Sequence, residues 1–75
     1  MFMSDETTIN DIVGHNIRLA REAAGLSQEQ LARVLGKDRR MVSRWELGGG
    51  ISEPNLRKLA ATLDIPFLSF YQGDV

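Results

Sequence analysis

The stretch LSQEQLARVLGKDRRMVSRWE, from Leu26 to Glu46, predicts two short amphipathic helices joined by a tight turn. Apolar residues recur at helical spacing in each half, which gives each helix one buried stripe. The two stripes consist of Leu26, Leu31, Ala32 and Leu35, then Met41, Val42 and Trp45. Gly36 lies between them, where a glycine in the left-handed conformation can end a helix. The stretch therefore predicts helix, turn and helix.

Both helix starts carry capping residues. Ser27 can accept from orphan backbone amides, and Gln30, three residues on, can reach back to the Ser27 amide as in a capping box. Asp38 can cap the second helix through its carboxylate. We therefore expect helices from about Ser27 to Leu35 and from about Asp38 to Leu47.

The second of these helices is predicted to turn a cationic face to solvent. With Met41, Val42 and Trp45 directed inward, the outer residues are Arg39, Arg40, Ser43 and Arg44. An α-helix fits the major groove of DNA, where a guanidinium that bonds twice to guanine contributes about 1–3 kcal/mol of discrimination. Three arginines on an arbitrary helix are more often a solvated charged face, but their place directly after a tight turn favours base recognition.

Composition limits the other functions. Seventy-five residues with 43% hydrophobic composition make one domain with a single small core. There is no cysteine, which excludes disulfides and thiolate metal sites, and the single histidine, His15, is expected at the surface. With no second histidine and no paired carboxylates at ligand spacing, we expect no metal. No serine has a recognisable base and orienter around it, so we expect no catalysis, and we expect no cofactor. Without a signal peptide or membrane-spanning stretch, we expect a soluble intracellular protein.

The net charge of −1 conceals an uneven distribution of charged residues. Residues 33–44 hold five basic side chains against one acid, whereas residues 1–17 and 59–75 hold acids only. This arrangement suits a protein that presents one face to a polyanion and binds it weakly outside its specific site.

The remaining sequence predicts further helical segments and no strand. A first helix runs from about Ile9 to Ala24 and is closed by Gly25, and a fourth is capped by Ser52. Their apolar stripes are Val13, Ile17, Ala20 and Ala24, then Leu56, Leu59, Ala60 and Leu63. The predicted fold class is all-α, a compact bundle of four to five helices. We expect a flexible tail over residues 1–8, one domain over 9–72, and a second tail over 73–75.

The loop after the third helix, Gly48 to Gly50, permits close approach of the backbone to another surface. Its amides are candidates for contacts with DNA phosphates, and a connector without a ligand is the equally open alternative. The glycines form neither GxGxxG nor a P-loop, so nucleotide binding is not predicted.

A short apolar segment follows Pro66. It holds more apolar surface than so short a chain can bury, which predicts either a dimer seam or a satellite of the core. The residues concerned are Phe67, Leu68, Phe70 and Tyr71.

Together these features resemble the XRE family, the helix-turn-helix domains of phage Cro and repressor proteins. The matching pattern is Ile17, Arg21, Leu26-Ser27-Gln28-Glu29, Leu31-Ala32, Gly36, Val42-Ser43-Arg44-Trp45-Glu46 and Leu59-Ala60. It covers about residues 14–71. The resemblance implies a lambda repressor-like bundle whose third helix lies in the major groove of DNA, with base contacts from the outer face of that helix.

The resemblance also implies roles for residues outside the third helix. Gln28 is expected to contact a DNA phosphate, and Arg21 is expected to form an ion pair with Glu46. We add Lys37 to the expected backbone contacts. Leu47 departs from the family pattern, because a polar residue is common there, and the loop of three glycines lacks the usual basic residues.

We therefore expect a sequence-specific regulator of transcription, bacterial or phage-encoded and cytoplasmic, that binds double-stranded DNA. As a repressor it would bind a two-fold operator as a homodimer, with half-sites about 34–36 Å apart. One alternative is a protein-interaction module, antitoxin-like or an adaptor, that binds through the C-terminal aromatic residues or the acidic N-terminus. Another is the N-terminal domain of a longer regulator.

Overall fold

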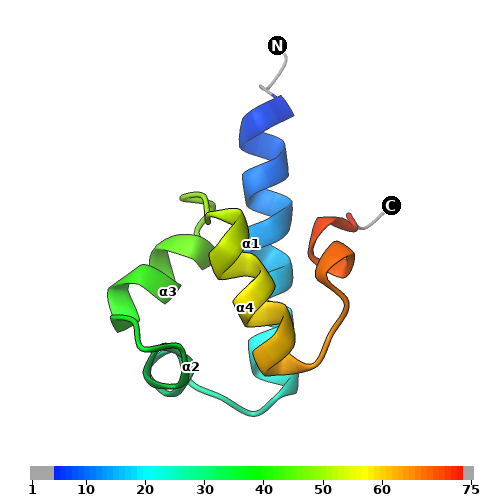
Figure 1. Cartoon of the computed structure of the whole chain (residues 1–75). Helices are drawn as coiled ribbons and strands as arrows, with labels where there is room; N and C mark the ends of the chain where they lie inside the picture. The colour runs from blue at the N-terminus through cyan, green and yellow to red at the C-terminus, as the bar shows by residue number, and fades with distance from the viewer. Residues whose placement is uncertain (1–4, 74–75) are drawn as a thin grey trace.

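The structure, a computed structural model, describes residues 5–73, which form four α-helices and one 3₁₀ helix without a strand (Figure 1). The elements are α1 (Asp5–Ala23), α2 (Gln28–Leu35), α3 (Arg39–Glu46), α4 (Glu53–Leu63) and η1 (Phe67–Tyr71). The predicted all-α bundle is thus confirmed. The expected tails fall partly outside the described residues, at 1–4 and 74–75. Residues 5–8, expected in the first tail, are helical backbone instead.

The predicted capping residues begin three of the helices. The Ser27 hydroxyl accepts from the Gln30 amide at 3.0 Å, and the Gln30 side chain accepts from the Ser27 amide at 2.8 Å, which completes the capping box of α2. Asp38 accepts from the Arg40 amide at 2.9 Å at the start of α3. Ser52 caps α4 in the same way. These local bonds fix where the chain enters each helix.

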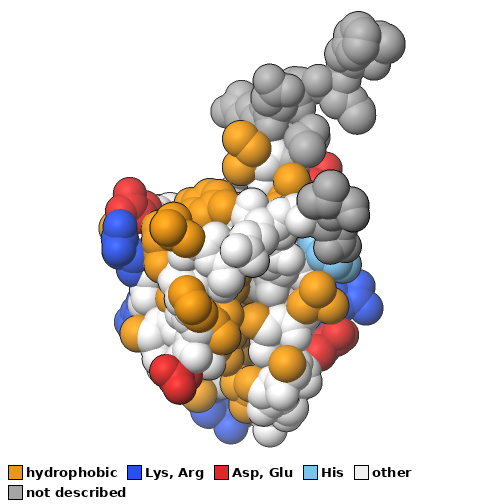
Figure 2. All heavy atoms as spheres, turned by 90° about the vertical axis from the view of Figure 1, so that its right-hand side faces the viewer, with side chains coloured by type: hydrophobic (Ala, Val, Ile, Leu, Met, Phe, Trp, Pro, Cys, Tyr) orange, Lys and Arg blue, Asp and Glu red, His pale blue; other side chains and the backbone are white. Residues whose placement is uncertain are grey.

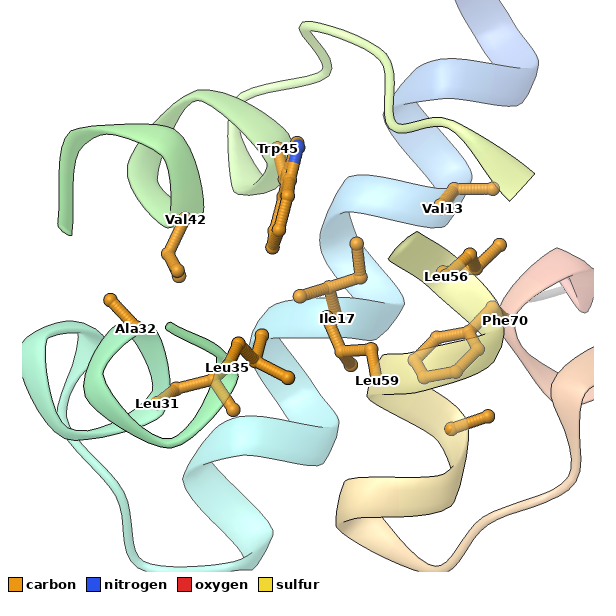
Figure 3. Close-up of a cluster of buried hydrophobic side chains, with 11 residues drawn as sticks. Val13, Ile17, Leu31, Ala32, Leu35, Val42, Trp45, Leu56, Leu59 and Phe70 are labelled. Atoms are coloured by element: carbon orange, nitrogen blue, oxygen red, sulfur yellow. The ribbon is translucent and has the colours of Figure 1, made fainter. Parts of the chain in front are cut away.

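A single core holds the bundle together (Figure 3). It consists of Val13 and Ile17 from α1, Leu31, Ala32 and Leu35 from α2, Val42 and Trp45 from α3, Leu56, Leu59 and Ala60 from α4, and Phe70 from η1. Full burial of an aliphatic or aromatic side chain contributes about 1.5–3 kcal/mol. Val42 and Trp45 belong to this cluster, so their packing determines which face of α3 is turned to solvent.

Two residues predicted on buried stripes are exposed, and those predictions were wrong. Met41 is 37% exposed. At about 100° per residue, it lies some 100° around the helix from Val42 and marks the edge of the stripe. Ala24 is exposed because α1 ends at Ala23 and the chain turns away through Gly25, whose φ is 74°.

The backbones of α1 and α3 come close together at Gly14. A Cβ added to this residue would lie 2.5 Å from the carbonyl oxygen of Trp45 and 2.9 Å from that of Glu46. Real Cβ atoms essentially never come that close to another heavy atom. The absent side chain therefore lets the C-terminal end of α3 rest directly on the backbone of α1.

The 3₁₀ helix η1 is attached to α1 on the side away from α3 (Figure 1). The Asn16 side-chain amide donates to the carbonyl oxygens of Phe70 at 2.8 Å and Gln72 at 2.9 Å. This anchor leaves α3 free at the other side of the bundle. No helix within residues 5–73 is long and apolar enough to cross a membrane.

Candidate nucleic-acid interface

The cationic face of α3, formed by Arg39, Arg40 and Arg44, is exposed. On the opposite side of the helix, Val42 is fully buried and Trp45 is 4% exposed. The Arg40 guanidinium lies 3.7 Å from the Asp38 carboxylate, but both side chains are largely in solvent. Exposed pairs of this kind contribute at most about 1 kcal/mol, so Arg40 is readily released to a partner. The three guanidinium groups thus form an accessible positive surface on a helix whose back is fixed.

The other two residues expected near this face are partly covered. Ser43 and Lys37 are both half-buried. The Lys37 amide donates to the Ala32 carbonyl oxygen at 2.8 Å, which closes the C-terminal end of α2. Lys37 therefore stands in the turn between α2 and α3, and Ser43 on the flank of α3 that meets α1 and α2.

The glycine loop, Gly48 to Gly50, is packed against α1 and α3. A Cβ on Gly48 would collide with the Asp11 carboxylate, and one on Gly49 would lie 2.6 Å from Cγ of Arg44. Gly48 and Gly50 also adopt φ of 89°, a conformation that side chains other than glycine rarely take. These contacts explain the glycines structurally, which the sequence left open.

Arg21 and Glu46 form a partly buried ion pair between α1 and the end of α3. Arg21 Nε donates to Glu46 Oε2 at 2.6 Å, and Arg21 Nη2 donates to Oε1 at 3.1 Å. The side chains are only 11% and 4% exposed. Arg21 Nη1 also donates to the Leu26 carbonyl oxygen at 2.8 Å, which ties in the turn before α2. The bond from Glu46 raises the pKa of Arg21, so the guanidinium is charged at neutral pH.

Gln28, at the first position of α2, joins this pair. Its side-chain amide donates to Glu46 Oε1 at 3.0 Å. Beside it opens the Gln28 pocket, a cavity of about 220 Å³ lined by Arg18, Arg21, Gln28, Ser43, Glu46 and Leu47. Sequence reasoning placed neither Arg18 nor the bond between Gln28 and Glu46 at this site. Arg18 lies one helical turn before Arg21, and this spacing could have predicted that the two side chains share a face of α1.

The C-terminal apolar residues divide between core and surface. Phe70 is fully buried. Phe67 is half-buried, and the Arg57 guanidinium lies over its ring at 4.2 Å from the ring centre. Leu68 and Tyr71 remain 70% and 44% exposed.

A neighbouring groove of about 290 Å³ is lined by Ile9, Ile12 and Tyr71. Figure 2 faces this side of the molecule and shows hydrophobic side chains over much of it, with charged groups mostly toward the edges. The expected satellite of the core and an apolar surface are therefore both present, built from different residues.

Comparison with known proteins agrees with this architecture. Residues 17–70 match the helix-turn-helix family HTH_3. The crystal structure of the hypothetical transcription factor NHTF from Neisseria superposes with a TM-score of 0.81 at 34% identity, covering 96% of this chain and 84% of that one. The restriction-modification controller protein C.AhdI from Aeromonas hydrophila gives a TM-score of 0.77 at 40% identity, covering 83% of this chain and 96% of that one.

Two further similarities bear on fold and length. An HTH_3 family transcriptional regulator from Vibrio cholerae shares the fold at 22% identity, with a TM-score of 0.79, over 88% of this chain and 38% of that one. A hypothetical transcription factor of Neisseria meningitidis serogroup B is 38% identical over 84% of this chain. The matched region spans 60% of the length of that protein.

Proposed function

This chain belongs to the HTH_3 helix-turn-helix family, and from that premise we propose that it is a sequence-specific, double-stranded DNA-binding regulator of transcription. It acts by occupying an operator rather than by chemistry. The observation that carries the proposal is the cationic face of α3, whose three arginines are exposed while Val42 and Trp45 behind them are buried. A rigid helix with such a face matches the width and the acceptor pattern of the major groove.

The proposal assigns the contacts by chemistry. Arg39, Arg40 and Arg44 read base edges with Ser43 beside them, since guanidinium groups recognise the O6 and N7 atoms of guanine. Gln28, Lys37 and the Gly50 amide contact phosphates and set the register of the helix on the duplex. The amides of Gly48 and Gly49, also expected to contact phosphates, instead donate to the carbonyl oxygens of Trp45 at 3.1 Å and Arg44 at 2.9 Å. The exposure of the three arginines supports their assignment to base edges.

A homodimer on a two-fold operator completes the proposal. Leu68 and Tyr71 present apolar surface on the side of α1 away from α3, next to the groove of Ile9 and Ile12. Contact through this surface would leave both cationic faces uncovered, and binding to paired half-sites requires the two faces on one side of the dimer, about 34–36 Å apart. We place this activity in the cytoplasm of a bacterium or of a phage-infected cell.

Selection from random duplexes tests the DNA-binding proposal. The wild-type chain should enrich one sequence, and Arg40→Ala or Arg44→Ala should relax preference at single base pairs, each worth about 1–3 kcal/mol. Lys37→Ala should weaken all sequences alike and lower the slope of log affinity against log salt by about one. If the three variants instead reduced affinity equally for every sequence, the assignment of base and phosphate contacts would be wrong.

The same apolar surface supports a second candidate, a module that binds another protein. That candidate would be favoured over the regulator if selection at low salt enriched no duplex and the wild-type chain sedimented as a monomer. Sedimentation of the selected complex at two chains per duplex would support the regulator.

A further inference from the structure

Glu46 makes more bonds than the ion pair alone requires. Its Oε2 accepts from Arg21, while its Oε1 accepts both from Arg21 Nη2 at 3.1 Å and from Gln28 Nε2 at 3.0 Å. One carboxylate thereby connects α1, the first turn of α2 and the last residue of α3.

The location of this carboxylate is costly for the helix that carries it. A negative charge at a helix C-terminus opposes the helix dipole, and a nearly buried carboxylate also loses hydration. Arg21 compensates both costs through its two bonds to Glu46. Because Arg21 neutralises the carboxylate, Glu46 can hold an amide in place without repelling an anion that approaches the same region.

Gln28 is the residue held in place. An amide nitrogen carries two hydrogens, and the bond to Glu46 uses one of them. The side chain lines the Gln28 pocket with Ser43, a hydroxyl that can donate to an oxyanion, and with Arg18. The Arg18 Nε donates to Glu22 at 3.2 Å, and because both of these side chains are well exposed, this pair is weak. A free glutamine side chain would lose rotamer freedom on contacting a ligand, whereas one already bonded to Glu46 has lost much of it beforehand.

We propose that Glu46 is a positioning residue for DNA binding, which acts by orienting the Gln28 amide toward one phosphate of the duplex. This inference rests on the proposed function. It gives the ion pair a part in DNA recognition in addition to its part in joining α1 to α3.

Two double variants separate these roles. Arg21→Met with Glu46→Leu removes the ion pair and the Glu46 oxygen that accepts from Gln28. Arg21→Met with Glu46→Gln removes the same ion pair but keeps a carbonyl oxygen that can accept from Gln28. The two proteins differ at one side chain, and replacing both charged partners avoids stranding either charge in the core.

The readout is a phosphate-by-phosphate binding profile. Duplexes of the selected sequence carry a single neutral methylphosphonate at each position in turn, and the dissociation constant is measured for each. Gln28→Ala identifies its phosphate as the position at which only the wild type is sensitive to neutralisation. We expect a loss of about 3- to 10-fold there, the size of one hydrogen bond.

The double variant with Glu46→Leu should lose sensitivity at that phosphate while remaining sensitive at all others. The double variant with Glu46→Gln should retain it. Equal profiles for the two would overturn the inference and leave Glu46 a role in the fold only, as would a Gln28→Ala profile identical to that of the wild type. If the wild type selects no duplex at all, the proposed function fails first, and that result is distinct from equal profiles.

Folding of both double variants is checked by circular dichroism before binding is measured. If either is unfolded, the wild-type protein provides the test through the NMR signals of the Gln28 side-chain amide, which are assigned by their absence in Gln28→Ala. These signals should shift on addition of the selected duplex and should shift less with the duplex neutralised at the Gln28 phosphate. An unchanged position of the signals in both titrations would overturn the inference.

Discussion

Replacement of Gly14 by alanine should destabilise the protein even though alanine favours helix. The added methyl group would lie 2.5 Å from the carbonyl oxygen of Trp45, against a practical minimum of 3.0 Å, so α1 and α3 must separate by at least 0.5 Å at their crossing. The obstructing atoms belong to the backbone of α3 and cannot rotate away as the end of a side chain would.

The expected size follows from two opposed effects. Alanine inside a helix is more stable than glycine by about 0.5–1 kcal/mol. Overpacking a tight contact costs about 1–3 kcal/mol. We therefore expect Gly14→Ala to lower the free energy of unfolding by about 1–2 kcal/mol, which for a domain of this size lowers Tm by about 5–15 °C.

Thermal and urea unfolding followed by circular dichroism measure this loss. The matched control is His15→Ala, since His15 is the next residue of the same helix and its side chain is exposed. The control should change stability by less than about 0.5 kcal/mol. A Gly14→Ala protein as stable as the wild type would refute the argument that the two backbones are in contact at this crossing.

Three further predictions use the same measurements or sedimentation. Gly36 ends α2 at φ of 69° with no heavy atom near its absent side chain, so Gly36→Ala should cost about 1–2 kcal/mol in unfolding free energy through backbone strain alone, and Gly36→Asn clearly less. Val42→Ala should lower the free energy of unfolding by about 1–3 kcal/mol, whereas Met41→Ala should change it by less than about 1 kcal/mol, because Val42 is fully buried and Met41 is not. Equal losses in the two variants would mean that Met41 is a core residue. Leu68→Asp should leave Tm nearly unchanged but convert the proposed dimer to a monomer in sedimentation velocity, and a dimer that persists in the variant would exclude Leu68 from the interface.

The sequence predicted those features that depend on neighbouring residues. Ser27 and Asp38 cap their helices through bonds to amides two or three residues away, so the starts of α2 and α3 were readable from spacing. The same holds for Val42 and Trp45, which share a stripe of helical period. From these elements both the fold class and the cationic face of α3 could be predicted.

Features that depend on distant parts of the chain were missed. Met41 lies at helical spacing from Trp45, four residues before it. Whether its side chain is buried depends on how far the neighbouring helices extend along α3. Gly14 and Asn16 look ordinary within a helical pattern, and their roles arise from contacts with α3 and η1. The bond between Gln28 and Glu46 spans 18 positions and follows from the packing of α2 against α3.

The anchoring of η1 by Asn16 also determines where an addition to the protein can be tolerated. Since that segment is fastened to the flank of α1 remote from α3, the described chain ends on the side of the bundle away from α3 (Figure 1). A fluorescent tag or a surface-attachment peptide appended there would keep clear of an incoming duplex. It would instead lie near Tyr71, on the apolar surface proposed for the dimer. A tag at this position should therefore leave DNA binding by one chain intact while it reports, or prevents, the assembly of two chains.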